Sequence, residues 1–230
     1  MFTVKAMVIQ LDLLKKINYF ADLTDAELES IKKLISEQTV EAGEMFLSEG
    51  KRSNYMYFVI SGVVNVHKTS TDGKEQVMNM ATTGESLNDV STYNGNATAA
   101  NMIAMTPVIL YRIRKKDMMV ILENHPKVAL NALKVLAGRV RRDSSLVRDL
   151  SFTQVTSRLA KMLLTYFAGA KTDDWPRFTQ HDMASIVGTT REVVNRSLSD
   201  MEKKGAIRLE RHSIVILNKS TLEKMIESSS

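Results

Sequence analysis

The chain has 230 residues, of which 44% are hydrophobic, and its formal net charge is +5. This length fits one large domain or two modest ones with a real core, and the positive charge permits a polyanionic partner without requiring one. The absence of cysteine excludes disulfides, a thiol switch and a cysteine-ligated iron–sulfur cluster.

The sequence carries none of the usual signs of export or catalysis. Charged residues interrupt its first twenty positions, and no apolar run reaches membrane-spanning length. We therefore expect no signal peptide, no transmembrane helix and no membrane partner, which predicts a cytoplasmic protein. The four histidines are scattered, and no catalytic triad, phosphate-binding loop or zinc spacing is found. We accordingly expect neither an enzyme nor a metal site.

The first half has the pattern of a β-rich domain preceded by two helical stretches. Strand-forming runs occupy Tyr55–Ile60, Val63–Lys68 and Gln76–Ala81, and residues 98–113 supply two more. Turns recur at intervals of eleven residues, at Gly62, Gly73, Gly84 and Gly95. Regular turns between short strands predict an antiparallel barrel or sandwich. Such a domain can hold a ligand, or side chains can fill it.

A long helix is predicted to begin at Pro126. Residues at alternating spacings of three and four form a stripe, which consists of Leu133, Leu136, Val140, Asp143, Val147 and Leu150. This is the seam of a two-stranded coiled coil and predicts a homodimer; the alternative is a helix packed on its own β-domain. Asp143 in the seam would set its register or touch a ligand. The solvated face is expected to carry Arg139, Arg141, Arg142 and Arg148.

The last third predicts one helix and then a helix-turn-helix. A hinge, the helix and a linker are expected over Phe152–Gln154, Val155–Phe167 and Gly169–Arg177. Thr179 and Asp182 can cap the next helix, which Gly188 ends. Thr190 can cap the last one, which closes at Gly205.

The last helix of this motif has one apolar and one polar side. The residues that helical spacing places on the inward side are Val194, Leu198 and Met201. The residues left on its exposed N-terminal face are Arg191, Glu192, Asn195 and Arg196. Recognition helices place such side chains against base edges in the major groove, where Arg can bind guanine and Glu can accept from cytosine. The alternative is an ordinary i,i+4 ion pair between Glu192 and Arg196.

The residues after Gly205 predict a β-hairpin wing. Two apolar runs flank a polar break at Arg211–His212. A wing that follows a recognition helix is typical of a winged helix-turn-helix, which binds double-stranded DNA. Backbone phosphates are then expected to contact Thr179, Gln180, Thr189 and Thr190.

The run REVVNR at Arg191–Arg196 resembles the R-E-x-x-x-R of the cyclic-AMP receptor branch of the Crp/Fnr superfamily of bacterial transcription regulators. The resemblance covers most of the chain and implies an α+β fold. Its parts would be a β-roll sensor, or double-stranded β-helix, over 1–125, a dimerisation helix and hinge over 126–152, and a winged helix-turn-helix over 153–230. It also implies that Arg191, Glu192 and Arg196 read a TGTGA half-site, and that RNA polymerase is a partner.

In cyclic-nucleotide members of that family, a Gly-Glu pair holds the ribose and an Arg-Ser pair holds the phosphate. The corresponding places here are Asn88-Asp89 and Thr98-Ala99; a register on Gly84-Glu85 also leaves Thr98 in place of Arg. Without that Arg, a buried phosphate lacks a charge-assisted partner, so we expect weak cyclic AMP binding or none. The effector is expected to be another small molecule, which the same alignment surrounds with Asn88, Asp89, Thr92, Tyr93, Thr98, Asp143 and Ser144.

Two alternatives concern what the β-domain does. Some members of the family sense nitric oxide or carbon monoxide with haem, and His67 is the only histidine in the β-domain that could ligate it. A lone histidine on a strand is, however, usually structural. The other alternative is a regulatory or scaffold module that does not bind DNA.

Overall fold

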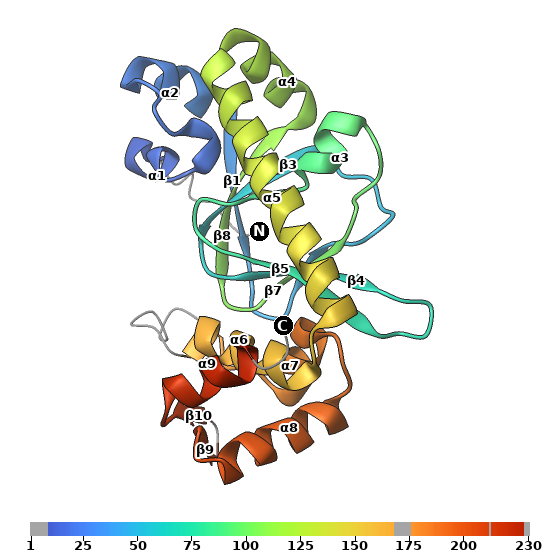
Figure 1. Ribbon diagram of the computed structural model, residues 1–230. Coiled ribbons are helices and arrows are strands. Elements are labelled where there is room, and N and C mark those ends of the chain that lie inside the picture. Colours follow the sequence, from blue (N-terminus) through green and yellow to red (C-terminus); the bar gives the residue numbers. More distant parts are fainter. Residues whose placement is uncertain (1–8, 168–175, 212, 228–230) are drawn as a thin grey trace. The chain divides into compact units, whose positions relative to one another are not determined.

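The structure is a computed structural model that describes residues 9–167, 176–211 and 213–227 (Figure 1). Most of the predicted linker Gly169–Arg177, as well as His212, lies outside the described residues. The chain divides into two compact units, residues 1–66 with 79–140 and residues 67–78 with 141–230. The predicted α+β architecture is confirmed: antiparallel sheets come first, a long helix follows, and a winged helix-turn-helix ends the chain.

Short helices open the first unit. They are α1 (Leu11–Lys15), η1 (Asn18–Phe20) and α2 (Asp25–Lys32). Thr24 caps α2 in a reciprocal capping box with Glu27, which satisfies two backbone N–H groups at the start of the helix. The carbonyl of Gly84 accepts a hydrogen bond of 3.1 Å from the Asn18 backbone. Gly84 has a φ of +90°, and a Cβ there would lie 2.4 Å from the carbonyl oxygen of Lys16, so only glycine permits this approach.

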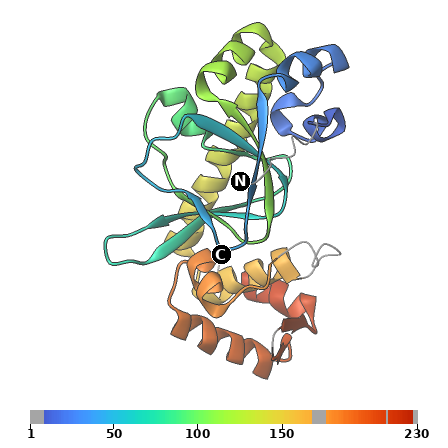
Figure 2. The ribbon, with the colours of Figure 1, turned by 180° about the vertical axis from the view of Figure 1, so that it is seen from behind.

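Two four-stranded sheets form the β-domain. Figure 2 shows this domain from behind. One has the order β1 (Ile35–Val40), β8 (Val108–Arg114), β3 (Tyr55–Ser61), β6 (Ser86–Leu87). The other has the order β2 (Met45–Leu47), β7 (Asn101–Ala104), β4 (Val64–Thr69), β5 (Glu75–Ala81). The predicted strands are confirmed to within one residue or a few residues. The sequence analysis did not predict β1, β2 and β6.

Apolar side chains fill the space between the sheets and the space outside one of them. The inner cluster includes Val59, Val64 and Leu110, all fully buried. The outer cluster joins Phe58 to Tyr19 and Phe20 of the short helices, with ring centroids 5.5 and 5.2 Å apart. Clusters on both faces of β3 explain why that strand reads as a nearly continuous apolar run.

The next helices are α3 (Asp89–Asn94), α4 (Lys115–Asn124) and α5 (Pro126–Phe152). The first turns of α5 pack on the β-domain through Val128 and Ala132. Asn131 adds a hydrogen bond of 2.9 Å from its amide nitrogen to the carbonyl of Ala21. One face of α5 therefore belongs to the β-domain, as the alternative interpretation expected, while the predicted seam lies on another face.

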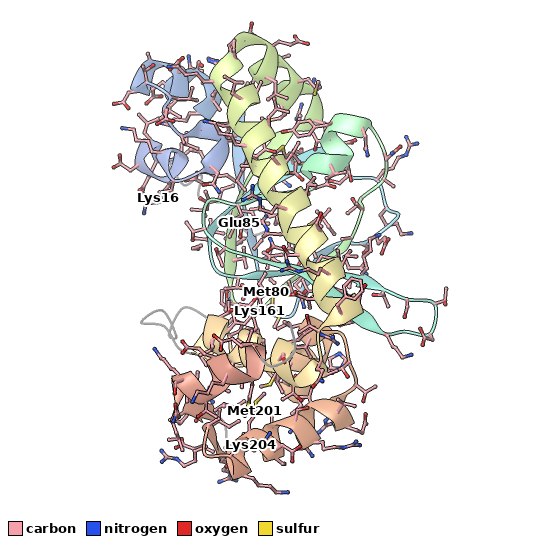
Figure 3. The ribbon with its side chains drawn as sticks, viewed as in Figure 1. Lys16, Met80, Glu85, Lys161, Met201 and Lys204 are labelled. Atoms are coloured by element: carbon pink, nitrogen blue, oxygen red, sulfur yellow. The ribbon has the colours of Figure 1, made fainter. Side chains whose placement is uncertain are left out.

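The second unit is built on α6 (Val155–Phe167), α7 (Gln180–Val187), α8 (Arg191–Lys203), β9 (Ile207–Glu210), β10 (Ser213–Ile216) and α9 (Lys219–Glu227). Its core includes Leu159, Leu163, Val194 and Met201, and Met201 on α8 is labelled in Figure 3. In the described part of the chain, no helix combines the length and the apolar character needed to cross a membrane.

Arg158 of α6 links the end of α5 to the end of α7 by hydrogen bonds. Its guanidinium donates to the carbonyls of Val187 at 2.7 Å, Asp149 at 3.2 Å and Gly188 at 3.3 Å, and also to that of Thr153. Carbonyls at a helix C-terminus lack partners within the helix, and a guanidinium can satisfy several at once. The chain does leave the helix between Phe152 and Val155, where a hinge was predicted, but Arg158 bridges this break.

Candidate functional site

The helix-turn-helix is held by caps that the sequence predicted. Thr179 and Asp182 form a reciprocal box at the start of α7, with the Thr179 N–H donating to Asp182 Oδ2 at 2.7 Å. Gly188 ends that helix in the left-handed conformation, with φ at +70°. The Thr190 hydroxyl then accepts from the Val193 N–H at the start of α8. These contacts fix where α8 begins, and therefore which of its residues face outward.

The two sides of α8 separate as expected. Val194, Leu198 and Met201 are buried, whereas the outward set is exposed and consists of Arg191, Glu192, Asn195 and Arg196. Hydrogen bonds from its own backbone N–H and from Thr190 hold the pKa of Glu192 below its usual value, so it remains an ionised acceptor. The i,i+4 ion pair with Arg196 does not form in the part of the chain that the structure describes.

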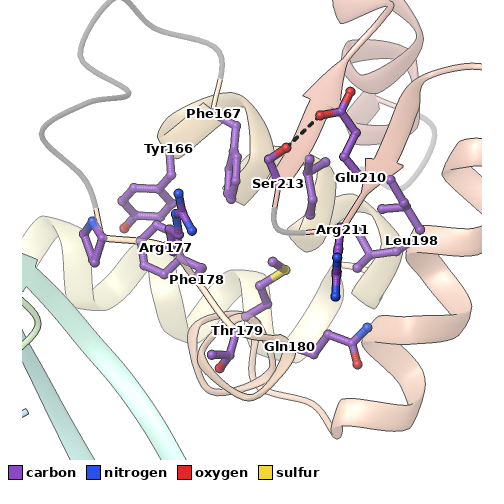
Figure 4. Close-up of a pocket in the computed structure, with 14 residues that line it drawn as sticks. Tyr166, Phe167, Arg177, Phe178, Thr179, Gln180, Leu198, Glu210, Arg211 and Ser213 are labelled. Atoms are coloured by element: carbon purple, nitrogen blue, oxygen red, sulfur yellow. Dashed lines mark hydrogen bonds between the residues drawn. The ribbon is translucent and has the colours of Figure 1, made fainter.

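The predicted wing is confirmed as the antiparallel pair β9 and β10, with Leu209 opposite Ile214. Glu202 near the end of α8 accepts from the Leu209 N–H at 2.7 Å and joins the wing to the recognition helix. Between the wing and α7 lies a cavity of about 690 Å³, and Figure 4 shows Tyr166 and Phe178 on its wall. The rings of these two residues pack against each other, with centroids 5.1 Å apart.

The predicted effector cassette folds as β6 and α3 rather than as an open loop. Asn88 adopts a left-handed backbone with φ at +62°, and its carbonyl accepts from the Thr92 hydroxyl at 2.8 Å. Asn88, Asp89 and Thr92 are thereby brought together, and all are buried. Thr98 is also buried, beyond the end of α3. Among the described residues, neither its hydroxyl nor Asn88 Oδ1 has a hydrogen-bond partner.

Asp89 is the centre of a buried polar network. Its side chain is 1% exposed and forms an ion pair with Arg139 of α5. The Tyr19 hydroxyl donates to Asp89 Oδ2 at 3.2 Å, and the Ser86 hydroxyl donates to the same oxygen at 2.8 Å. Arg139 Nη2 also donates to the Ser86 carbonyl at 3.2 Å. A buried carboxylate requires such partners, because an unpaired charge in the interior is costly.

Burial and the charges of this network shift the pKa values of the groups around it. Burial alone would lower the pKa of Arg139, but the charge and hydrogen bond of Asp89 more than offset this and raise it. Burial, followed by the charge of Asp89, raises the pKa of Tyr19. Burial raises the pKa of Tyr93, the half-buried member of the cassette, to about 12. Both phenols therefore stay neutral at pH 7 and can act as hydrogen-bond donors.

The expectation that Arg139 lies on the solvated face of α5 was wrong. Its side chain is 24% exposed, and its ion pair with Asp89 holds it against the β-domain. Tyr19 and Ser86 were missed as well, because they come from segments outside the cassette or at its start. The sequence pattern does not separate Arg139 from Arg141, which also flanks the seam residue Val140 but is exposed.

The remaining predicted residues of α5 lie as follows. Leu133, Val140 and Val147 of the seam are 63%, 65% and 64% exposed, and Leu150 is exposed too. Leu136 and Asp143 are half-buried, whereas Ser144 is exposed. Asp143 and Ser144 belong to the second unit, and their contact with an effector stays a prediction. An apolar stripe of this length, open to solvent in one chain, is a surface that a partner helix can cover.

His67, the candidate haem ligand, lies buried on β4. Its Nε2 is 3.8 Å from Glu75 Oε1, and its Nδ1 has no hydrogen-bond partner within the part of the chain that the structure describes. Among the described residues, no group of three or more His, Cys, Asp or Glu side chains could hold a metal ion.

Comparisons with known proteins agree with this architecture. Residues 37–125 match the family model of the cyclic nucleotide-binding domain, and residues 157–225 match that of the Crp-like helix-turn-helix domain. The chain is 25% identical over 219 residues to the CRP-like cAMP-activated global transcriptional regulator of Mycobacterium tuberculosis, covering 93% of this chain and 98% of that protein. It is 24% identical over 208 residues to the cyclic AMP receptor protein of Thermus thermophilus, covering 90% and 95%. The c-di-GMP-responsive global regulator CLP of Xanthomonas campestris shares the fold, with a TM-score of 0.76 at 18% identity over 84% of this chain and 99% of that one.

The ion pair of Asp89 and Arg139 generates a stability prediction. Arg139→Met leaves the buried carboxylate without its cation, which should cost about 3–5 kcal/mol of unfolding free energy. Arg141 lies two residues further along the same helix, and its side chain is exposed. Arg141→Met should therefore cost less than about 0.5 kcal/mol of unfolding free energy. Urea unfolding of both variants measures the difference. Adding Asp89→Asn to Arg139→Met should recover part of the loss, and equal midpoints for the two single variants would contradict the role of the pair.

Proposed function

The chain belongs to the Crp/Fnr superfamily of bacterial transcription regulators, and from this premise we propose that it is a ligand-responsive homodimer that reads a TGTGA-like palindrome and whose effector is not cyclic AMP. It is a DNA-binding transcription regulator, and its relatives are regulators rather than enzymes. The comparisons favour neither a scaffold module nor a haem sensor, and ligation of haem by His67 stays a prediction. Contact with RNA polymerase likewise stays a prediction.

The observation that carries the DNA-reading part is the polar face at the start of α8. Arg191, Glu192 and Arg196 project from a helix whose other side is anchored in the core. An arginine can donate two hydrogen bonds to guanine O6 and N7, and a glutamate can accept from cytosine N4. Those pairings fit the G·C pairs of a TGTGA half-site.

Contacts with backbone phosphates are assigned to Thr179, Gln180, Thr189 and Thr190. They lie at or beside the N-termini of α7 and α8, where backbone N–H groups and the helix dipole favour an anion. Such contacts set the position of the module on the duplex, and the polar face of α8 supplies the sequence preference.

Dimerisation is assigned to the seam of α5. A second copy of the helix would cover Leu133, Val140 and Val147, each more than 60% exposed in the single chain. Pairing two recognition helices through this seam would place them on half-sites about 34 Å apart, one turn of DNA. An effector would act by shifting the population of dimers with that spacing.

The effector is proposed to differ from cyclic AMP because of two features of the cassette. The residue at the place of the family's phosphate-binding arginine is Thr98, a neutral and buried side chain. The carboxylate at the place of the ribose-binding glutamate is that of Asp89, which already has Arg139, Tyr19 and Ser86 as partners. A ribose hydroxyl would have to compete with these groups.

The DNA-reading residues can be tested by selecting bound duplexes from a random pool. The wild type is expected to enrich a TGTGA-like inverted repeat. Arg191→Ala and Arg196→Ala should each cost about 1–3 kcal/mol on that repeat and relax the preference at one base pair. Binding to single-base variants of the repeat measures this. Weakening that is the same on every duplex would mean that the arginines contact phosphate alone.

The seam can be tested by sedimentation of the free protein. Val140→Glu places like charges opposite each other at the centre of the proposed dimer and should shift it to monomers at concentrations where the wild type is a dimer. Arg141→Glu is the control, because it changes the charge by more but lies one residue off the seam, on an exposed position. An unchanged dimer in Val140→Glu would exclude this interface.

The effector assignment can be tested by calorimetric titration with cyclic AMP. The Mycobacterium tuberculosis relative, titrated in parallel, serves as the positive control. We expect binding to this chain to be absent or far weaker, because an unmatched buried phosphate loses a charge-assisted pair. Micromolar affinity for cyclic AMP would refute the assignment.

A further inference from the structure

The polar face of α8 is connected to α7 through one side chain, that of Gln180. Gln180 is the first residue of α7 and extends toward α8, as Figure 4 shows. Its Oε1 lies 3.3 Å from Arg191 Nε, and its Nε2 lies 3.3 Å from Asn195 Oδ1. One amide therefore contacts two of the proposed DNA-reading residues, which are one turn apart on α8.

The donor and acceptor atoms of Arg191, Gln180 and Asn195 fix the orientation of each side chain in turn. Arg191 Nε carries a single N–H and can only donate, so Gln180 must present its oxygen to it. The NH2 of the same amide then faces Asn195, which must answer with its oxygen. The remaining group of Asn195, its own NH2, is turned away from Gln180.

These orientations determine which hydrogen-bond donors and acceptors α8 presents to a base. Because Arg191 uses Nε internally, its two terminal nitrogens remain to bind the O6 and N7 acceptors of guanine. Asn195 offers a donor rather than the combined donor and acceptor that would match adenine. Fixing these side chains before binding also reduces the rotamer entropy lost on the DNA.

We propose that Gln180 is a positioning residue that sets the hydrogen-bond polarity of Arg191 and Asn195, and thereby the bases they prefer. This inference rests on the proposed function, because it assumes that the polar face of α8 reads DNA. It goes beyond the assignment of Gln180 as a phosphate contact, since a phosphate contact carries no sequence preference.

The test measures binding of purified full-length variants to the repeat that the wild type selects, to its single-base variants and to an unrelated duplex, at one salt concentration. Gln180→Ala should lower the discrimination by about 5- to 10-fold at the base pair that Arg191→Ala also relaxes, the lower part of the range for one bidentate contact. Thr189→Ala, the matched control at a proposed phosphate contact, should weaken all duplexes by one factor and leave discrimination unchanged.

Gln180→Glu is the sharper variant, because a carboxylate can accept from Arg191 Nε but cannot donate to Asn195. Discrimination at the base pair that Arg191 reads should be retained. If the variant simply lost a structural contact, this discrimination would fall. Asn195 should turn its NH2 toward the new carboxylate and its oxygen outward, so its preference should move toward bases that present a donor, adenine or cytosine. The added negative charge should weaken all duplexes alike and cancels in the ratios.

Two kinds of result would overturn the proposal, and they have separate meanings. If Gln180→Ala weakens every duplex equally, as Thr189→Ala does, Gln180 is a phosphate contact and the proposed function still stands. If the wild type selects no sequence, or if Arg191→Ala leaves discrimination unchanged, the proposed function fails and the positioning role falls with it.

Discussion

The pairing of Asp89 with Arg139 is the interaction on which the first unit depends. Asp89 starts α3 and Arg139 belongs to α5, while Tyr19 and Ser86 bring η1 and β6 to the same carboxylate. Four elements from three separate stretches of the chain therefore share one buried charge. Because neither partner is tolerated in the interior without the other, the position of the first turns of α5 on the β-domain is specified by charge as well as by apolar packing.

The second unit uses a different device, in which local hydrogen bonds determine what the surface displays. The capping box of Thr179 and Asp182 fixes the start of α7, and Thr190 fixes the start of α8. A helix that began one residue later would turn by about 100° and carry Arg191 and Arg196 off the outward face. The same cap places Gln180 at the first helical position, within reach of α8. Caps of this kind are thus part of the recognition surface and not only of its stability.

Much of this could be predicted from the sequence because it rests on local rules. Caps, glycine ends and apolar spacing located the helix-turn-helix, and strand runs between regular turns located most of the β-domain. The pairing of Arg139 with Asp89 could not be predicted in that way, because it joins residues fifty positions apart whose proximity depends on the tertiary fold. The strand β1 was missed for a related reason: Ser36, Glu37 and Gln38 give it a polar composition, and pairing with β8 makes it part of a sheet. The strand β2 is apolar but has only three residues, and its pairing with β7 defines it. The residues of the DNA and effector sites stay predictions.

The four-carbonyl contact of Arg158 has a mechanical consequence. It ties the last turn of α5 to the end of α7, so the break between α5 and α6 cannot act as a loose joint. If the last turns of α5 rotated, the helix-turn-helix would rotate with them, because the backbone at Thr153 and Gln154 could not absorb the change. The angle of the recognition helix would then follow the twist of α5, and substitutions at Arg158 would uncouple the two without touching a sensor residue, the seam or a base.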